Sequence, residues 1–361
     1  MTMDWLIDWT LSSWLGFLGS PGAFILAAVV GGLAIFGLVA VHAIVAVYVE
    51  RKVSAFMQDR IGPMGQGPGL HAGKWGVLQT VADALKLLLK EDIIPALADR
   101  RLFILAPFIL FMGAFIGFVA IPFAPALVLA DFNVGLFYIL AVSSFGVLGL
   151  ILAGWASNNK WSLYGAMRSA AQIISYEIPA AISLLAVVIL AGTLNLQSLT
   201  AAQQGTILGF LPNWFIFQNP FTFMAFFIYF IAAVAETNRT PFDIPEAESE
   251  LVAGFHTEYS GMRWAFFFLS EYANMFIVCA VAAVVFLGGW TSPLGELLSG
   301  PLWGLFWFMV KVIFLVLIMM WFRWTFPRLR VDQLMNVSWK VLLPWSFINL
   351  LGSALWWLWR S

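Results

Sequence analysis

Eight long runs of apolar residues, separated by shorter polar segments, constrain this sequence more than any other feature. A helix that crosses a lipid bilayer needs roughly 20 consecutive, mostly apolar residues. Only 10% of the 361 residues are charged, whereas soluble domains carry about 25%. We therefore predict an all-α integral membrane protein with a single multi-span domain over residues 1–361, and exclude a soluble enzyme. The expected spans are residues 23–49, 101–123, 134–155, 171–192, 220–236, 264–288, 302–322 and 340–359.

The distribution of Lys and Arg predicts how the spans are oriented. These residues concentrate between the first and second spans and in the loops after the third, fifth and seventh spans, while the loops after the second, fourth and sixth contain none. Cytoplasmic loops of membrane proteins carry such an excess of basic residues. We therefore expect segments 50–100 and 236–263 to face the cytoplasm, and both termini to lie on the opposite side.

Two segments outside the spans have patterns typical of helices that lie along a membrane surface. In residues 78–90, Leu78, Val81 and Leu85 recur at helical spacing, while Asp83 and Lys86 fall elsewhere on the helical wheel. Residues 1–20 mix Trp, Leu and Phe with Asp and Ser. Because an apolar face with a polar opposite face favours the interface, we expect an amphipathic helix in each segment.

The sequence contains no recognisable metal, nucleotide or nucleic-acid site. The single cysteine, Cys279, excludes a disulfide framework and an iron–sulfur cluster held by this chain alone, and the three histidines are scattered. Residues 67–72 fit G-x-G-x-x-A literally but contain a proline and lie outside any strand–turn–helix context. We therefore expect this chain to bind no metal and no redox cofactor, which leaves any such group to partner chains.

Four carboxylates interrupt or end the apolar spans, and these are the candidate functional residues. An acidic side chain at the middle of a span costs roughly 2.5–3.5 kcal/mol on insertion scales. Burial also raises the pKa of a carboxyl group, so such groups hold or release protons near neutral pH. The alternative is neutralisation by a neighbouring arginine, Arg51 for Glu50 and Arg168 for Glu177. The four are Glu50, Glu177, Glu236 and Glu271.

A dense acidic segment follows the fifth span. It contains Asp243, Glu246, Glu248, Glu250 and Glu258, with only Arg239 and Arg263 as basic counterparts. Like charges at this density repel, and protonation or outside cations relieve the repulsion. Part of the pattern has another explanation, because Asp243 to Glu246 matches a capping box that would start a short helix. A solvated acidic loop remains the alternative for the others.

The motifs in and around these spans resemble one family closely. The chain is similar to the membrane-embedded H subunit (subunit 1 in mitochondria) of the respiratory NADH:quinone oxidoreductase, complex I. The similarity extends from about Tyr48 to Asn274 and is accompanied by a matching length and number of spans. It rests on Tyr48-Val49-Glu50-Arg51-Lys52, Ala82-Asp83-Ala84-Leu85-Lys86-Leu87, Gly154-Trp155-Ala156-Ser157-Asn158-Asn159-Lys160, Ser175-Tyr176-Glu177, Glu236 to Val252, Glu258-Tyr259 and Ser270-Glu271-Tyr272-Ala273-Asn274.

The resemblance implies a role inside a larger assembly. In the family, this subunit lies in the bacterial inner (plasma) membrane beside other small membrane subunits, and it docks the cytoplasmic arm that carries FMN and iron–sulfur clusters. Quinone is the substrate and enters a long chamber from the lipid bilayer. The family's quinone chamber maps onto Glu50, Arg51 and Arg60. Its proton-coupling chain maps onto Glu177, Glu236, Asp243, Glu246, Glu248, Glu250, Glu258 and Glu271, with Arg168 and Arg239 as charge partners.

The sequence departs from the family in one loop and leaves two alternative functions open. The loop over residues 62–75 looks longer than the family's compact glycine-rich turn, which affects the expected mouth of the chamber. A related electron-transfer complex, either a membrane-bound hydrogenase or a ferredoxin-fed oxidoreductase, would use a similar subunit without reducing quinone. A stand-alone secondary transporter would also contain buried carboxylates, but no internal repeat of the kind such transporters carry is visible.

Overall fold

The computed structural model describes residues 7–8, 21–64, 75–125, 127–207, 211–245, 248–294, 298 and 300–360. Over these residues the protein is almost entirely helical, which confirms the predicted fold class. All eight predicted spans are helical. Seven segments are long and apolar enough to cross a membrane, and the shorter α9, with 17 residues, is the eighth. The spanning helices are α2 (Pro21–Met57), α4 (Arg100–Gly117), α5 (Gly135–Ala156), α6 (Lys160–Ala191), α9 (Pro220–Glu236), α11 (Gly261–Phe286), α12 (Pro301–Thr325) and the continuous run α13 (Val331–Asn336), η5 (Val337–Leu342) and α14 (Leu343–Arg360).

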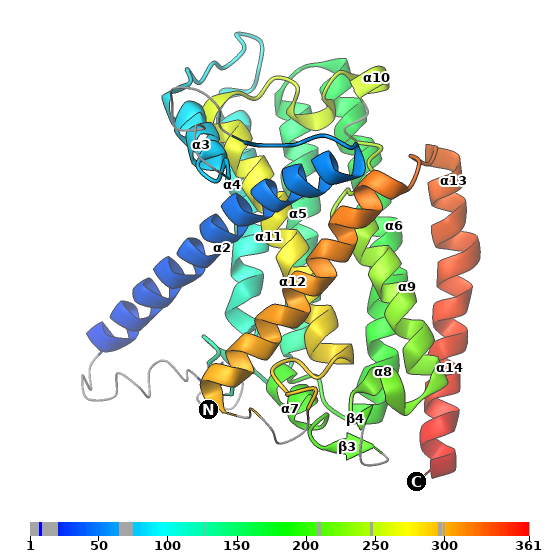
Figure 1. Ribbon diagram of the computed structural model, residues 1–361. Helices are drawn as coiled ribbons and strands as arrows, with labels where there is room; N and C mark the ends of the chain where they lie inside the picture. The colour runs from blue at the N-terminus through cyan, green and yellow to red at the C-terminus, as the bar shows by residue number, and fades with distance from the viewer. Residues whose placement is uncertain are drawn as a thin grey trace.

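The short elements gather at the two ends of the helical bundle. Figure 1 shows α3 and α10 at one end, and α7, α8, β3 and β4 at the other. The predicted amphipathic helix of segment 78–90 is confirmed as α3. The short elements are α3 (Gln79–Leu89), η3 (Phe118–Ala120), α7 (Leu196–Ala201), α8 (Phe215–Gln218), α10 (Glu248–Leu251), η4 (Gly254–His256), and the strands β1 (Ile7–Asp8), β2 (Asp131–Phe132), β3 (Thr206–Ile207) and β4 (Leu211–Pro212).

Helix α11 forms the centre of the molecule. Its residues from Met275 to Phe286 are buried on every side, and a helix that is apolar all round is expected at the core of a bundle. Helices α4, α9 and α12 pack against it, and α6 packs against α5, α9 and α14. Helices α2 and α12 run obliquely across the more upright helices (Figure 1) and expose many large apolar side chains. The bundle therefore has an apolar core centred on α11 and an apolar perimeter suited to lipid.

Local sequence signals fix where several helices begin and end. The Asn219 side chain accepts a hydrogen bond from the Phe221 amide at 2.8 Å, and Pro220 occupies the first turn of α9. Asp99 accepts hydrogen bonds from the first-turn amides of α4. Gly192 ends α6 in the left-handed conformation, with φ of 68°, which glycine adopts without a steric penalty. The Asn219 and Asp99 side chains satisfy amide groups that a helix start leaves without partners.

Three expectations differ from the structure or lie outside its described part. Within segment 1–20 only Ile7 and Asp8 are described, and they form a strand paired with β2 rather than a helix. Residues 65–74 of the 62–75 loop are outside the described residues, as is Glu246. Asp243 and Ile244 are not helical in the structure, the Asp243 carboxylate pairs with Arg328, and the described part of the short helix is α10, Glu248–Leu251.

Candidate functional site

A buried cluster of two carboxylates and two guanidinium groups lies where α2, α11, α12 and the loop after α9 meet. Glu50, near the end of α2, is only 7% exposed. Its Oε2 accepts a hydrogen bond from Arg239 Nη1 at 2.8 Å and another from the Tyr272 hydroxyl at 2.6 Å. Its other oxygen, Oε1, pairs with Arg323 of α12. Glu50 is thus held by donors from three separate elements.

Arg239 joins this carboxylate to a second one. Its side chain is 2% exposed, and its Nε lies 2.7 Å from Oε1 of Glu271 on α11. The guanidinium group also lies over the Tyr272 ring, 4.7 Å from the ring centre. Burial alone would lower the pKa of Arg239, but the carboxylates of Glu271 and Glu50 raise it well above its ordinary value. Arg239 is therefore a fixed positive charge between two carboxylates, and with Arg323 it brings the formal charge of the cluster to zero.

The loop that carries Arg239 is itself held in place by α6. The Gln172 side-chain nitrogen lies 2.8 Å from the Ala235 carbonyl oxygen, 2.8 Å from the Phe242 carbonyl oxygen and 3.1 Å from the Asn238 side-chain oxygen. Gln172 is fully enclosed, with 2% of its surface exposed. One buried amide thus binds the loop on both sides of Arg239.

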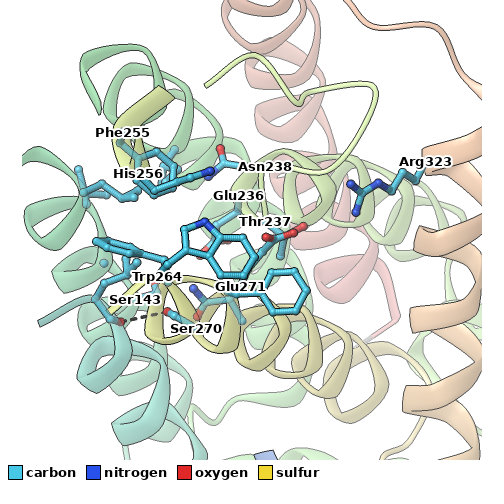
Figure 2. Close-up of a pocket in the computed structure, with 18 residues that line it drawn as sticks. Ser143, Glu236, Thr237, Asn238, Phe255, His256, Trp264, Ser270, Glu271 and Arg323 are labelled. Atoms are coloured by element: carbon cyan, nitrogen blue, oxygen red, sulfur yellow. Dashed lines mark hydrogen bonds between the residues drawn. The ribbon is translucent and has the colours of Figure 1, made fainter. Parts of the chain in front are cut away.

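A cavity of about 270 Å³ adjoins the cluster. Figure 2 shows Glu236, Glu271, Asn238, His256 and Trp264 around it. Glu271 therefore contacts Arg239 on one side and reaches the cavity on the other. The walls combine apolar rings with carboxylate, amide, imidazole and hydroxyl groups, so the space suits water held by two or more polar partners.

A second, smaller cavity continues from the first into the bundle. It has a volume of about 20 Å³ and shares Ser143, Glu236 and Asn274 with the larger cavity. Tyr229 and Val278 lie farther along its wall. This volume accommodates about one water molecule. Glu236 therefore stands where the two spaces meet.

His256 lies in η4, outside the spanning helices, and lines the larger cavity. Its ring packs edge-on against Phe255, with 5.0 Å between ring centres, and against Trp264, with 6.2 Å between ring centres. Burial lowers the pKa of His256 to about 4. The imidazole is therefore neutral at physiological pH, when it is able to donate and accept one hydrogen bond each.

The other predicted acidic residues lie outside this cluster, and most are paired. Asp243 pairs with Arg328 at 2.8 Å, yet its burial outweighs this and raises its pKa. Arg168 pairs with Glu250 at 2.5 Å, and Glu258 accepts a hydrogen bond from Asn159 at 2.6 Å. Glu248 begins α10. Glu177 of α6 is near enough to Glu236 for their charges to repel each other.

The two arginines that the sequence offered as charge partners of Glu50 and Glu177 pair with other carboxylates in the structure. Arg51 does not pair with Glu50 but with Asp83 of α3, at 2.6 Å. Arg168 likewise pairs with Glu250 and not with Glu177. Arg60 is exposed and donates to Gln58 and Ser54. Of the three predicted chamber residues, Glu50 is therefore the buried one, and the other two lie near the surface.

Sequence reasoning missed several residues of the site. Arg323 counted only as a basic residue at the end of a span, yet it contacts Glu50 and lines the cavity. Tyr272 and Asn274 belong to the motif Ser270–Asn274, but only Glu271 was singled out from it. Ser143 carries no sequence signal, because an isolated serine in an apolar span usually bonds a carbonyl of its own helix, as Ser143 does with Leu140.

Among the residues that the structure describes, no three His, Cys, Asp or Glu side chains are grouped so that they could hold a metal ion. Fold and site together define a class: multi-pass helical membrane proteins with buried, paired ionisable groups beside a polar cavity. Such intramembrane charges are rare and mark ion or proton pathways in membrane proteins.

Comparison with known proteins identifies the family. The sequence matches the family described as NADH dehydrogenase over residues 30–354. The NADH-quinone oxidoreductase H subunit of Chlorobaculum parvum is 56% identical over 318 residues, which cover 86% of each chain. The H subunit of Chlorobaculum tepidum is 52% identical over 358 residues, 96% of this chain and 98% of that one. That of Bacteroides thetaiotaomicron is 47% identical over 355 residues, 96% and 95% of the two chains. The chain belongs to this family, which confirms the resemblance inferred from its motifs.

Proposed function

We propose that this chain forms the quinone chamber and the proton-coupling path of a proton-translocating NADH:quinone oxidoreductase. The relatives are named as the H subunit of NADH-quinone oxidoreductase. The observation that carries the proposal is the position of Arg239, whose one guanidinium group contacts Glu50 of α2 and Glu271 of α11. A change of charge at one carboxylate therefore alters the electrostatic environment of the other.

Glu50 is the member of the cluster assigned to the quinone side. It lies near the C-terminal end of α2, which we assign to the cytoplasmic side, and its neighbour Arg51 contacts α3 through Asp83. Helix α3 exposes Leu85, Leu88 and Leu89, which gives it an apolar surface for a quinone tail arriving from the lipid. Arg60, which lies just after α2, is the third proposed chamber residue.

Glu271 and Glu236 are assigned to the proton side. Both line the cavity of about 270 Å³, and Glu236 also lines the smaller space beyond it. Ser143 and Asn274 supply polar atoms along the same wall. Water in these spaces would connect the two carboxylates, so protons could pass between them without crossing an apolar layer.

Electrostatic coupling links the quinone side to the proton side. Reduction of quinone to quinol takes two electrons, from a cluster in a partner subunit, and two protons. Electron arrival places negative charge near Glu50 and attracts Arg239 and Arg323 towards it, away from Glu271. Because loss of a neighbouring positive charge favours the protonated carboxyl, Glu271 then takes up a proton from the cavity, and it releases this proton when the quinone is protonated and the arginines return.

The remaining acidic residues are proposed to extend this chain towards the cytoplasmic surface. Asp243 pairs with exposed Arg328 and Glu250 with half-buried Arg168, and Glu246, Glu248 and Glu258 belong to the same segment. Glu177, near Glu236, would carry the chain across α6. We further propose a cytoplasmic location for α3 and α10, both termini on the opposite side, and other subunits of the oxidoreductase as partners.

The test is proton pumping by the intact complex in proteoliposomes. Glu271→Gln should preserve assembly but lower both NADH:quinone turnover and pumping at least tenfold, because the amide cannot ionise beside Arg239. Asp332→Asn, at an exposed acid paired only with Arg330, is the matched control and should leave both unchanged. Wild-type turnover and pumping in Glu271→Gln would exclude the proposed coupling role.

A further inference from the structure

A purely apolar groove separates α9 from α12 on the perimeter of the bundle. It has a volume of about 410 Å³, and all the lining surface is apolar. Aromatic rings dominate its walls, including Phe226 and Phe230 from α9, Phe322 from α12, and Phe242 and Phe326 at one end. The rings of Phe230 and Phe322 meet edge to face, with 6.0 Å between ring centres. The groove shares no lining residue with the polar cavity beside Glu271.

The size and depth of the groove limit what it can hold. A helix about 10 Å wide and 30 Å long occupies on the order of 2,400 Å³, far more than the groove offers. A hydrocarbon chain about 4.5 Å wide, crossing one leaflet, occupies roughly 250 Å³. The wall of α12 from Leu315 to its end at Thr325 rises about 15 Å, the depth of one leaflet. A single acyl chain fits within the groove, whereas a transmembrane helix would only pack over it.

Two exposed arginines lie at the end of the groove near Phe326, and each also contacts an aspartate, Arg328 with Asp243 and Arg330 with Asp332. The segment that follows α12 crosses this end, where the Leu329 amide donates a hydrogen bond to the Pro241 carbonyl at 3.1 Å. Arg328 and Arg330, on either side of Leu329, have side chains that are 41% and 76% exposed. Arg330 makes one long contact, 3.3 Å to Asp332, so most of its five N–H donors remain available. Exposed Trp324 lies just before this segment, as aromatic residues do at a membrane interface.

From this arrangement we propose that the groove binds one anionic phospholipid, with an acyl chain between α9 and α12 and its phosphate at Arg328 and Arg330. Within a bilayer an acyl chain gains little by leaving other lipid chains, because both surroundings are apolar. The headgroup contacts therefore decide which lipid occupies the site, and selectivity for an anionic headgroup is the expected signature.

The test uses the intact complex in nanodiscs, with photoactivatable phosphatidylglycerol or phosphatidylcholine carrying the reactive group on one acyl chain. Peptides from α9 and α12 should be labelled more strongly by the phosphatidylglycerol probe. Arg330→Gln should lower that labelling about fivefold, the factor expected from removing one basic side chain at an anionic surface, and should leave phosphatidylcholine labelling unchanged. Arg100→Gln, at an exposed arginine that begins α4, is the control and should change neither.

Filling the groove provides an independent variant. Ile318→Trp, from the α12 wall, should reduce labelling by both probes, and Ile231→Trp, from the α9 wall, replaces it if the first variant fails to assemble. Equal labelling by the two probes, or an unchanged Arg330→Gln variant, would overturn the proposal. So would loss of labelling on addition of excess quinone, which would assign the groove to quinone, or labelling that appears only after partner subunits are removed.

Discussion

The Tyr272 hydroxyl and Arg239 Nη1 donate to the same oxygen of Glu50, at 2.6 Å and 2.8 Å. The Tyr272 ring also packs against the face of the guanidinium group, with 4.7 Å between the ring centre and Cζ of Arg239. One tyrosine thus positions both members of a buried ion pair. An ion pair removed from water contributes to stability only when its remaining hydrogen-bonding groups are satisfied in good geometry, and Tyr272 supplies one of these contacts.

Replacement of Tyr272 by phenylalanine separates its two roles. Tyr272→Phe keeps the ring beneath Arg239 but removes the hydroxyl donor, and a hydrogen bond to a charged group contributes about 1.5–3 kcal/mol. We expect quinone-dependent turnover to fall severalfold while reduction of a soluble artificial acceptor by NADH is unchanged. Tyr138→Phe, which removes a long 3.4 Å bond to the Ile116 carbonyl, is the control. Identical kcat and KM for quinone in Tyr272→Phe and wild type would contradict the positioning role.

The Gln172 amide predicts a loop-release variant. Gln172→Leu preserves most of the side-chain volume but leaves the carbonyls of Ala235 and Phe242 without their buried donor. An unsatisfied buried polar group costs about 1–3 kcal/mol, so the segment around Arg239 should open more easily. Hydrogen exchange of peptides covering residues 235–242 should rise, with little change in the peptides of α4. Unchanged exchange at 235–242 would show that Gln172 does not hold the loop.

Sequence patterns were sufficient for the spans because their information is local. The run Pro220–Glu236 begins at an Asn-Pro cap and ends where the charge begins, and the structure places α9 over those residues. Helix α6 shows the limit of the same reasoning. It begins at Lys160, earlier than the expected span at 171, because the Asn159 cap and the polar first turns form a helix that projects beyond the apolar stretch.

The pairing of charges could not be read from the sequence in the same way. Glu50 and Arg51 are adjacent in the chain, but successive residues on a helix point about 100° apart. Glu50 consequently faces the bundle and meets Arg239 and Arg323, from positions far along the chain, while Arg51 faces α3. Which distant arginine fills the space beside a carboxylate depends on the tilt and packing of α2 and α12, and neither leaves a local pattern.

His256 predicts a specific pH dependence. Its pKa is lowered by burial to about 4, whereas an exposed histidine titrates near about 6.5. Between these values the unfolded chain binds more protons than the folded one, so stability decreases as the pH falls from about 6.5 towards 4. The loss from this residue would reach at most about 3 kcal/mol.

His256→Gln is the variant that isolates this effect, because it keeps a polar side chain without a titrating group. We expect the thermal unfolding midpoint of the complex to decrease less between pH 7.5 and pH 5 in the variant than in the wild type, while the two agree at the upper end. His256→Phe should show the same flattened profile if charge, rather than lost hydrogen bonding, is the cause. Parallel profiles for wild type and both variants would refute the assignment.

Lys311 predicts a purely structural defect at the opposite end of the molecule from α3. Its ammonium group lies on α12 and donates to the carbonyls of Leu287, Gly289 and Thr291 at 2.6, 2.8 and 2.7 Å. It also lies 4.3 Å from the Trp214 ring centre. These carbonyls follow the end of α11, where no further helical amides are available to bond them. Lys311 therefore fastens the end of the central helix to α12.

Lys311→Met should lower the stability of the assembled complex by about 3 kcal/mol, since three buried acceptors lose a charged donor together. Turnover per assembled complex should remain near the wild-type value, because Lys311 lines neither cavity beside Glu236. Lys160→Met tests the cation–π contribution alone, as exposed Lys160 lies 5.0 Å from the Trp161 ring and should change stability by less than about 1 kcal/mol. Differential scanning fluorimetry of the two variants, with turnover measured on the same samples, distinguishes a fastening role from a proton-carrying one. A stable but inactive Lys311→Met complex would place Lys311 on the proton path instead.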